Sequence, residues 1–239
     1  MISNSKSATS FPPVGRVIPL CPKLPGNAIT EAVAIYRELA AAHPDAFRPG
    51  LASSLNNQSG GLAALGRRED ALAASEEAVD LHRELAAAHP DAFRPDLAGS
   101  LNNQSNRLAA LGRREDALAA ITEAVDLYRE LAARLPEFRE SLAWTLTSLR
   151  IRLTEKKDFD EALSANREAA LIYAALLYLD PGRSRDPLEV ALRNLVIDLG
   201  DLGRSEQEIA GELDSFFTAA REPLTRACLP IQWHPRGRE

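Results

Sequence analysis

The residues best suited to catalysis or metal binding in this 239-residue chain are four histidines and two cysteines, and neither set forms a recognisable site. Cys21 and Cys228 lie near opposite ends with no CxxC pair, which disfavours a zinc site and a disulfide framework. HExxH, GxSxG, GxxxxGK and GxGxxG are all missing. We therefore expect no enzyme activity, metal or cofactor. The histidines have no metal-ligand spacing; they are His43, His82, His89 and His234.

The chain is organised by an internal repeat, and any other functional side chains must be positioned by that repeat. Residues 37–72 and 83–118 are related by a shift of 46 and differ at only four of 36 positions. A diverged third copy follows at a shift of 45, and a fourth begins near Leu188. Repetition at this period predicts an array of stacked units, because one short unit cannot bury its apolar faces alone.

Each unit contains two expected helices. Helix A runs from about Pro49 to Leu65 and ends at Gly66, a residue that readily takes the left-handed conformation. Helix B runs from about Arg68 to His89, with acidic residues in its first turn. The Ala- and Leu-rich composition and the helical spacing of apolar residues predict an all-α protein of about nine helices. His82 occupies the same repeat position as three tyrosines, so we expect it to pack; they are Tyr36, Tyr128 and Tyr173.

The repeat also divides the chain. We expect a disordered, Pro-rich leader at 1–26, a solenoid at 27–221 and an irregular tail at 222–239. The leader lacks the apolar core of a signal peptide, and no run of 18 apolar residues occurs, which favours a cytoplasmic protein without a membrane span. The net charge of −6 and interleaved Arg and Glu disfavour nucleic-acid binding. Within the solenoid we expect a lone B-type helix at 27–43 and repeats at 47–90, 93–135, 138–180 and 185–221, the last degenerate.

Specific residues carry a resemblance to a known family. Leu55-Asn56-Asn57 followed by Gly66, Ala71 and Ala78 is similar to the tetratricopeptide repeat (TPR) signature in its long, kinesin light chain-like form. The next unit repeats the pattern, but Lys157 replaces the inter-helix glycine in the third. The resemblance implies a right-handed superhelical solenoid of antiparallel helix pairs, with helix A lining a concave groove.

The four differences between the two near-identical copies are Gly50 to Asp96, Ser53 to Gly99, Gly60 to Asn106 and Gly61 to Arg107. We expect them to share one exposed stripe of helix A with Asn57, because they fall within an arc of about 100°. Asn carboxamides could then clamp a peptide main chain, and Arg107 and Arg152 could pair with a carboxylate or phosphate. Surface drift after duplication is the competing explanation. The groove implied by the resemblance contains Ser53, Asn57, Gly60, Gly99, Asn103, Asn106, Arg107, Ser148, Ile151, Arg152, Asn194, Ile197 and Asp198.

These observations favour a non-enzymatic scaffold that binds a peptide or partner protein in the groove. The alternative is a sensory or regulatory TPR module that controls a signalling or transcriptional partner. The C-terminal helix, with Ile209, Leu213, Phe216 and Phe217, is expected to cap the array or to mediate self-association.

Overall fold

The computed structural model describes residues 26–183 and 185–221, and these ranges form nine α-helices, one short 3₁₀ turn and no strand. The predicted all-α fold is therefore confirmed. The expected leader and tail, with Cys21, Cys228 and His234, lie outside or almost wholly outside the described residues. The elements are α1 (Gly26–Ala42), α2 (Pro44–Ala64), α3 (Arg68–Ala88), α4 (Pro90–Ala110), α5 (Arg114–Arg134), η1 (Pro136–Phe138), α6 (Arg139–Lys156), α7 (Phe159–Leu179), α8 (Asp186–Asp201) and α9 (Glu206–Arg221).

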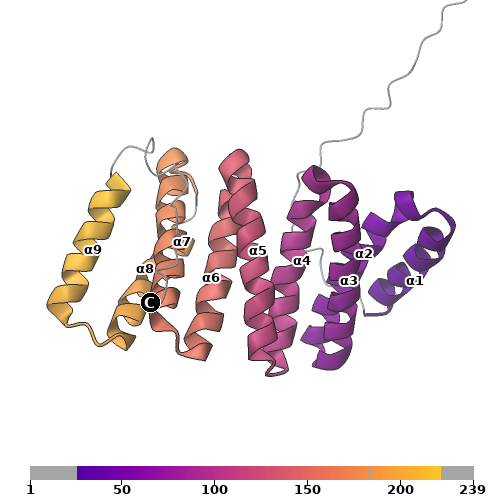
Figure 1. The fold of residues 1–239 in the computed structure, drawn as a ribbon, viewed down its shortest axis with the longest axis horizontal. Helices are drawn as coiled ribbons and strands as arrows, with labels where there is room; N and C mark the ends of the chain where they lie inside the picture. The colour runs from indigo at the N-terminus through magenta and orange to yellow at the C-terminus, as the bar shows by residue number, and fades with distance from the viewer. Residues whose placement is uncertain (1–25, 184, 222–239) are drawn as a thin grey trace, which may run out of the picture.

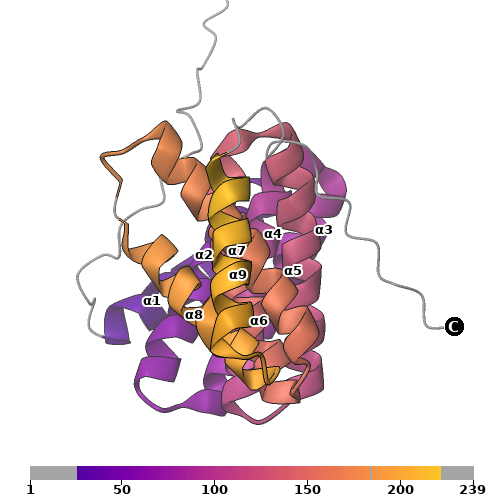
Figure 2. The same ribbon diagram turned by 90° about the vertical axis from the view of Figure 1, so that its left-hand side faces the viewer.

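The helices stand side by side in a row, because each packs mainly against its neighbours in the chain (Figure 1). Even-numbered helices are the A helices of the repeat, and odd-numbered helices are the B helices. Figure 2 looks along the row from the α9 end. The last pair is looser than the others, since α9 makes few contacts with α7 and α8. This stacking of helix pairs is the solenoid that the repeat predicted.

The first helix of each near-identical unit begins earlier than expected. We predicted a start near Pro49, but α2 begins at Pro44 and contains Pro49. Pro44 is well suited to the first turn, where its missing N–H leaves no hydrogen bond unmade. The additional turn also brings Phe47 against the core, and Phe93 does the same in α4. Burial of these rings offsets the hydrogen bond that the internal proline removes.

One residue with positive φ shapes each turn between an A helix and its B helix. Gly66, Gly112 and Gly203 have φ of 76°, 77° and 72°, and Lys157 has φ of 67°. The same two hydrogen bonds recur at each turn: at the third, the Lys157 N–H donates to the Thr154 carbonyl (3.0 Å) and the Asp158 N–H to the Leu153 carbonyl (2.9 Å). This pair of bonds defines a Schellman motif. Lys157 therefore adopts the glycine conformation with a side chain present.

Small and branched residues at equivalent positions form the core. Ala71, Ala117 and Ala162 have no exposed surface, and neither do Leu55 and Leu101. Alanine lets the A and B helices approach closely, while leucine fills the space between successive pairs. A larger cluster extends from Leu72 to Phe216, so α9 closes the far end of the core with one phenylalanine.

Candidate interaction surface

Three equivalent positions on each A helix remain accessible to solvent, and we call them the A-helix stripe. None of the twelve residues is buried. The first position holds Ser53, Gly99, Trp144 and Val190; the second holds Asn57, Asn103, Ser148 and Asn194; the third holds Gly60, Asn106, Ile151 and Ile197.

The stripe changes character along the row. On α2 and α4 it is small and polar, and a side chain added at Gly60 would meet no atom within 4 Å. On α6 and α8 its first and third positions are apolar, with Trp144, Ile151, Val190 and Ile197 respectively 65%, 41%, 46% and 48% exposed, while Ser148 and Asn194 keep the second position polar. Sequence reasoning named the two isoleucines but missed Trp144 and Val190. Trp144 has the same position relative to the Lys157 turn, and Val190 relative to the Gly203 turn, as Ser53 has relative to Gly66. This spacing was the signal that could have identified them.

Two of the four differences between copies do not lie on this stripe, so the expectation of a single exposed stripe is wrong for them. A Cβ added at Gly50 would overlap the ring of Tyr36 in α1. A Cβ added at Gly61 would lie 3.5 Å from Ile29, also in α1. Both positions therefore face the preceding helix, α1.

The two arginines predicted for the groove already have partners within the chain. Arg107 Nε donates to Ser59 Oγ of α2 at 3.1 Å, and burial lowers the pKa of Arg107. The Arg152 side chain is 11% exposed and pairs with Glu155 at 2.9 Å. Among the described residues the buried Nε of Arg152 has no hydrogen-bond partner. The guanidinium group of Arg107 therefore lies at the junction with α2, and that of Arg152 is largely covered and paired within α6 instead of projecting freely from the surface.

Asp198 is buried, which contradicts its predicted place in the groove. Its side chain is 1% exposed and receives Arg150 Nε at 2.8 and 2.9 Å and Arg150 Nη2 at 2.5 Å. Asn166 Nδ2 donates to the same carboxylate and to the Ala191 carbonyl, both at 3.1 Å. The cluster joins α6, α7 and α8. Because a buried charge needs both a counter-charge and hydrogen bonds, this arrangement neutralises Asp198 inside the array.

A second buried polar cluster joins the first two pairs. His82 Nδ1 lies 2.7 Å from Ser100 Oγ, which also accepts from Asn56 Nδ2 at 2.5 Å and donates to the Asp96 carbonyl at 2.9 Å. Since the one hydroxyl proton of Ser100 points to that carbonyl, Nδ1 of His82 is the donor. Burial lowers the pKa of His82 to about 4, so the ring is neutral at pH 7. The histidine has the packing role expected for it.

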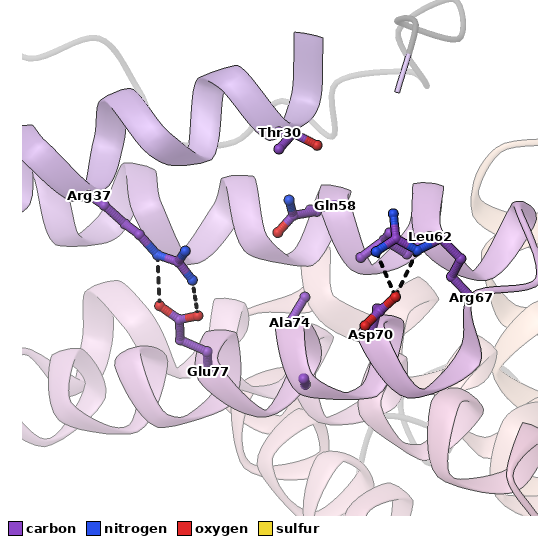
Figure 3. Close-up of a pocket in the computed structure, with 9 residues that line it drawn as sticks. Thr30, Arg37, Gln58, Leu62, Arg67, Asp70, Ala74 and Glu77 are labelled. Carbon is purple, nitrogen blue, oxygen red and sulfur yellow. Dashed lines mark hydrogen bonds and ion pairs between the residues drawn. The ribbon is translucent and has the colours of Figure 1, made fainter. Parts of the chain in front are cut away.

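A cavity of about 270 Å³ opens between α1, α2 and α3 (Figure 3). Its two ends are marked by the exposed ion pairs Arg37–Glu77 and Arg67–Asp70, and Gln58 lies between them. One repeat later, Glu76 reaches Arg113 at 3.6 Å, where the first unit has the shorter Thr30. The cavity is therefore a variation in how exposed ion pairs close a helix junction, and the two carboxylates that line it, Asp70 and Glu77, are each paired with an arginine.

The B helices present charged side chains along the row. Exposed or partly exposed ion pairs link each B helix to the next: Arg37–Glu77, Arg83–Glu123, Arg129–Glu168 and Arg167–Glu212. Across residues 26–183 and 185–221, no three His, Cys, Asp or Glu side chains gather as metal ligands. None of the helices in that part of the chain has the length and apolar character needed to cross a bilayer.

No protein-family model matches the chain, and a search of curated proteins finds no match. Solved structures do match. A crystal structure described as a kinesin light chain-like protein of Podosopora anserina with nearly identical TPR-like repeats aligns with a TM-score of 0.54 and 15% identity, over 82% of this chain and 90% of that one. A single-substitution variant of it aligns with a TM-score of 0.53 and 15% identity, over 84% and 90%. The chain has a TPR-like fold.

BtubC from P. vanneervenii aligns with 17% identity and a TM-score of 0.49, over 90% of this chain and 94% of that one. The two P. anserina structures confirm the TPR-like, kinesin light chain-like architecture that the Asn-Asn, Gly and Ala positions predicted. The A-helix stripe is one of the accessible surfaces of this array.

Proposed function

We propose that the protein is a non-enzymatic scaffold that binds an extended peptide of a partner protein along the A-helix stripe. The observation that carries this proposal is the run of accessible positions on four successive A helices. Ion pairs link four successive pairs of B helices, and leucine and alanine fill the space between pairs. A partner segment laid across the stripe can reach all four repeats without displacing core residues.

The polar half of the stripe is suited to main-chain recognition. Asn57 is exposed and Asn103 is partly exposed, at equivalent positions on α2 and α4. Each carboxamide can donate to a peptide carbonyl and accept from a peptide N–H at once. Gly60 leaves open space beside Asn57, so a peptide backbone can approach closely. Such contacts depend little on partner side chains.

A displayed library of random peptides tests the proposal. Peptides selected on the wild-type chain should bind the Asn57→Ala/Asn103→Ala variant at least tenfold more weakly, because two amide clamps are lost at about 1 kcal/mol each. The matched control is Asp80→Ala/Asp126→Ala, which changes exposed residues at equivalent positions of α3 and α5. Selected peptides that bind the asparagine variant as tightly as wild type contradict the assignment.

A regulatory role is the second candidate, and one feature favours it. Each helix contacts mainly its chain neighbours, so small rotations at each junction can add up to a change in the pitch of the array. A peptide that works in this way should change the radius of gyration in small-angle X-ray scattering. Binding without such a change supports the passive scaffold.

A further inference from the structure

Helix α8 is the last A helix in the described part of the chain, and its outer side is apolar. Together with α9 it forms the near end of the row in Figure 2. On this side Val190, Val196 and Ile197 are each more than two fifths exposed. Their separations of six and seven residues place them within one arc of about 120° on the helix. The row therefore ends in an apolar face that none of the described helices covers.

The exposure of Val196 follows from its place in the repeat. Three buried residues occupy the equivalent positions on α2, α4 and α6: Ser59, Ser105 and Arg150. In two of these cases the following A helix makes the contact, since Arg107 donates to Ser59 and Arg150 donates to Asp198. Position 196 is therefore the place at which an A helix receives another helix, and on α8 it holds an apolar side chain instead of a polar one.

We propose that a second copy of the chain docks on this face, with the two α8 helices antiparallel around a two-fold axis at Ile197. Arg193 lies four residues before Ile197 and Asp201 four residues after it, each about 6 Å away along the helix. The two-fold axis therefore brings Arg193 of each copy level with the partner's Asp201. Both side chains are exposed, and neither forms an ion pair with another described residue.

The order of charges along α8 favours a second copy over an unrelated partner. Opposite charges at equal distances on either side of one residue are what a two-fold contact requires, because each residue is used twice. In the same register Glu189 falls nearly level with the partner's Arg204. Gly200 leaves room for the approach, since a Cβ added there would meet no atom within 4 Å. Charge and space therefore both suit an antiparallel pair of α8 helices.

The size of the contact sets its expected strength. One helix from each copy buries less than the roughly 1,600 Å² of a standard stable interface, so we expect a dissociation constant on the order of 10 µM or weaker. The dimer covers the end of the row and leaves Asn57 and Asn103 accessible. It therefore stands apart from peptide binding at those asparagines, and each proposal can fail without the other.

Analytical ultracentrifugation of the full-length chain tests the dimer. The wild type should pass reversibly from monomer to dimer as its concentration rises from about 1 to 300 µM. Val196→Ser/Ile197→Asn introduces the residue types that α4 has at the equivalent positions, and it should weaken the dimer at least about tenfold. The control is Arg68→Glu on the exposed start of α3, which should leave dimerisation unchanged. A wild-type chain that stays monomeric, or that grows into longer assemblies, overturns the proposal.

Two charge reversals test the register of the contact. Arg193→Glu and Asp201→Arg each place like charges face to face, so each variant alone should dimerise at least about tenfold more weakly than the wild type. Mixed in equal amounts, the two variants should dimerise with each other, because both contacts then join opposite charges. Circular dichroism checks that each variant keeps the helical fold. Dimerisation that neither reversal weakens, or a mixture that forms no mixed dimer, overturns the proposal.

Discussion

Arg150 and Asp198 form a buried ion pair between α6 and α8, with both carboxylate oxygens within 2.9 Å of guanidinium nitrogens. Arg150 occupies the repeat position of Ser59, and Asp198 occupies that of Arg107. Since Arg107 donates to Ser59, the same two positions meet at both junctions, with the arginine on the opposite partner and an aspartate facing it in the second case. The repeat geometry therefore fixes which positions meet, and the residue types there can change together.

Removing one member of this pair should be costly. Asp198→Ala leaves Arg150 buried without a counter-charge and should lower the free energy of unfolding by about 3–5 kcal/mol. Arg150→Met/Asp198→Leu should lower it by less, because no uncompensated charge remains. Urea unfolding followed by circular dichroism measures both. A double variant less stable than Asp198→Ala would show that the pair itself is strongly stabilising.

Lys157 predicts a stabilising substitution. Its φ of 67° is strained for a residue with a Cβ, and the equivalent residue is glycine in the other three turns. Lys157→Gly should therefore raise the free energy of unfolding by about 1 kcal/mol. The control is Lys157→Ala, which removes the charge but keeps the Cβ. An equal gain in both variants, measured by urea midpoint, would attribute the effect to charge.

His82 predicts a loss of stability in mild acid. Its pKa is near 6.5 in the unfolded chain and about 4 in the fold, so the unfolded state binds the extra proton between these values. Stability should fall as the pH drops through 6.5 and level off below about 4. Between pH 7 and pH 5 the expected loss is about 2 kcal/mol.

His82→Gln removes the titrating ring and should flatten this pH dependence. Urea midpoints at pH 7, 6 and 5 compare the two chains, and the comparison stays above the range in which ordinary carboxylates titrate. An unchanged slope in the variant would assign the acid sensitivity to other groups.

The contact between Tyr36 and Gly50 can be tested by a double-mutant cycle in which one substitution restores the stability lost through the other. Gly50→Asp alone should destabilise the chain, because any side chain there overlaps the Tyr36 ring. The next repeat has His82 and Asp96 at these two positions. Tyr36→His should therefore recover about 1–2 kcal/mol in the Gly50→Asp background while bringing no gain by itself. Additive effects in this double-mutant cycle would exclude direct coupling.

The sequence alone determined the architecture and the register. A repeat of 46 residues with Gly66 and Gly112 at equivalent places predicts helix pairs, their turns and their order. These features depend on the local preferences of the backbone and on the spacing of apolar residues, both of which can be read from a single sequence. The stripe positions Asn57, Asn103 and Ile151 followed from the same register.

Only the tertiary structure decided what meets across each junction. Helical period shows which face a residue lies on, but not which neighbour fills the space opposite it. Asp198 looked like a groove residue until Arg150 and Asn166 were found around it, and Gly50 looked exposed until Tyr36 was placed above it. Helix α2 likewise begins before Pro49, because core contacts with Phe47 outweigh the local preference of proline for the first turn of a helix. Packing between repeats, which acts between residues far apart in sequence, settled these positions.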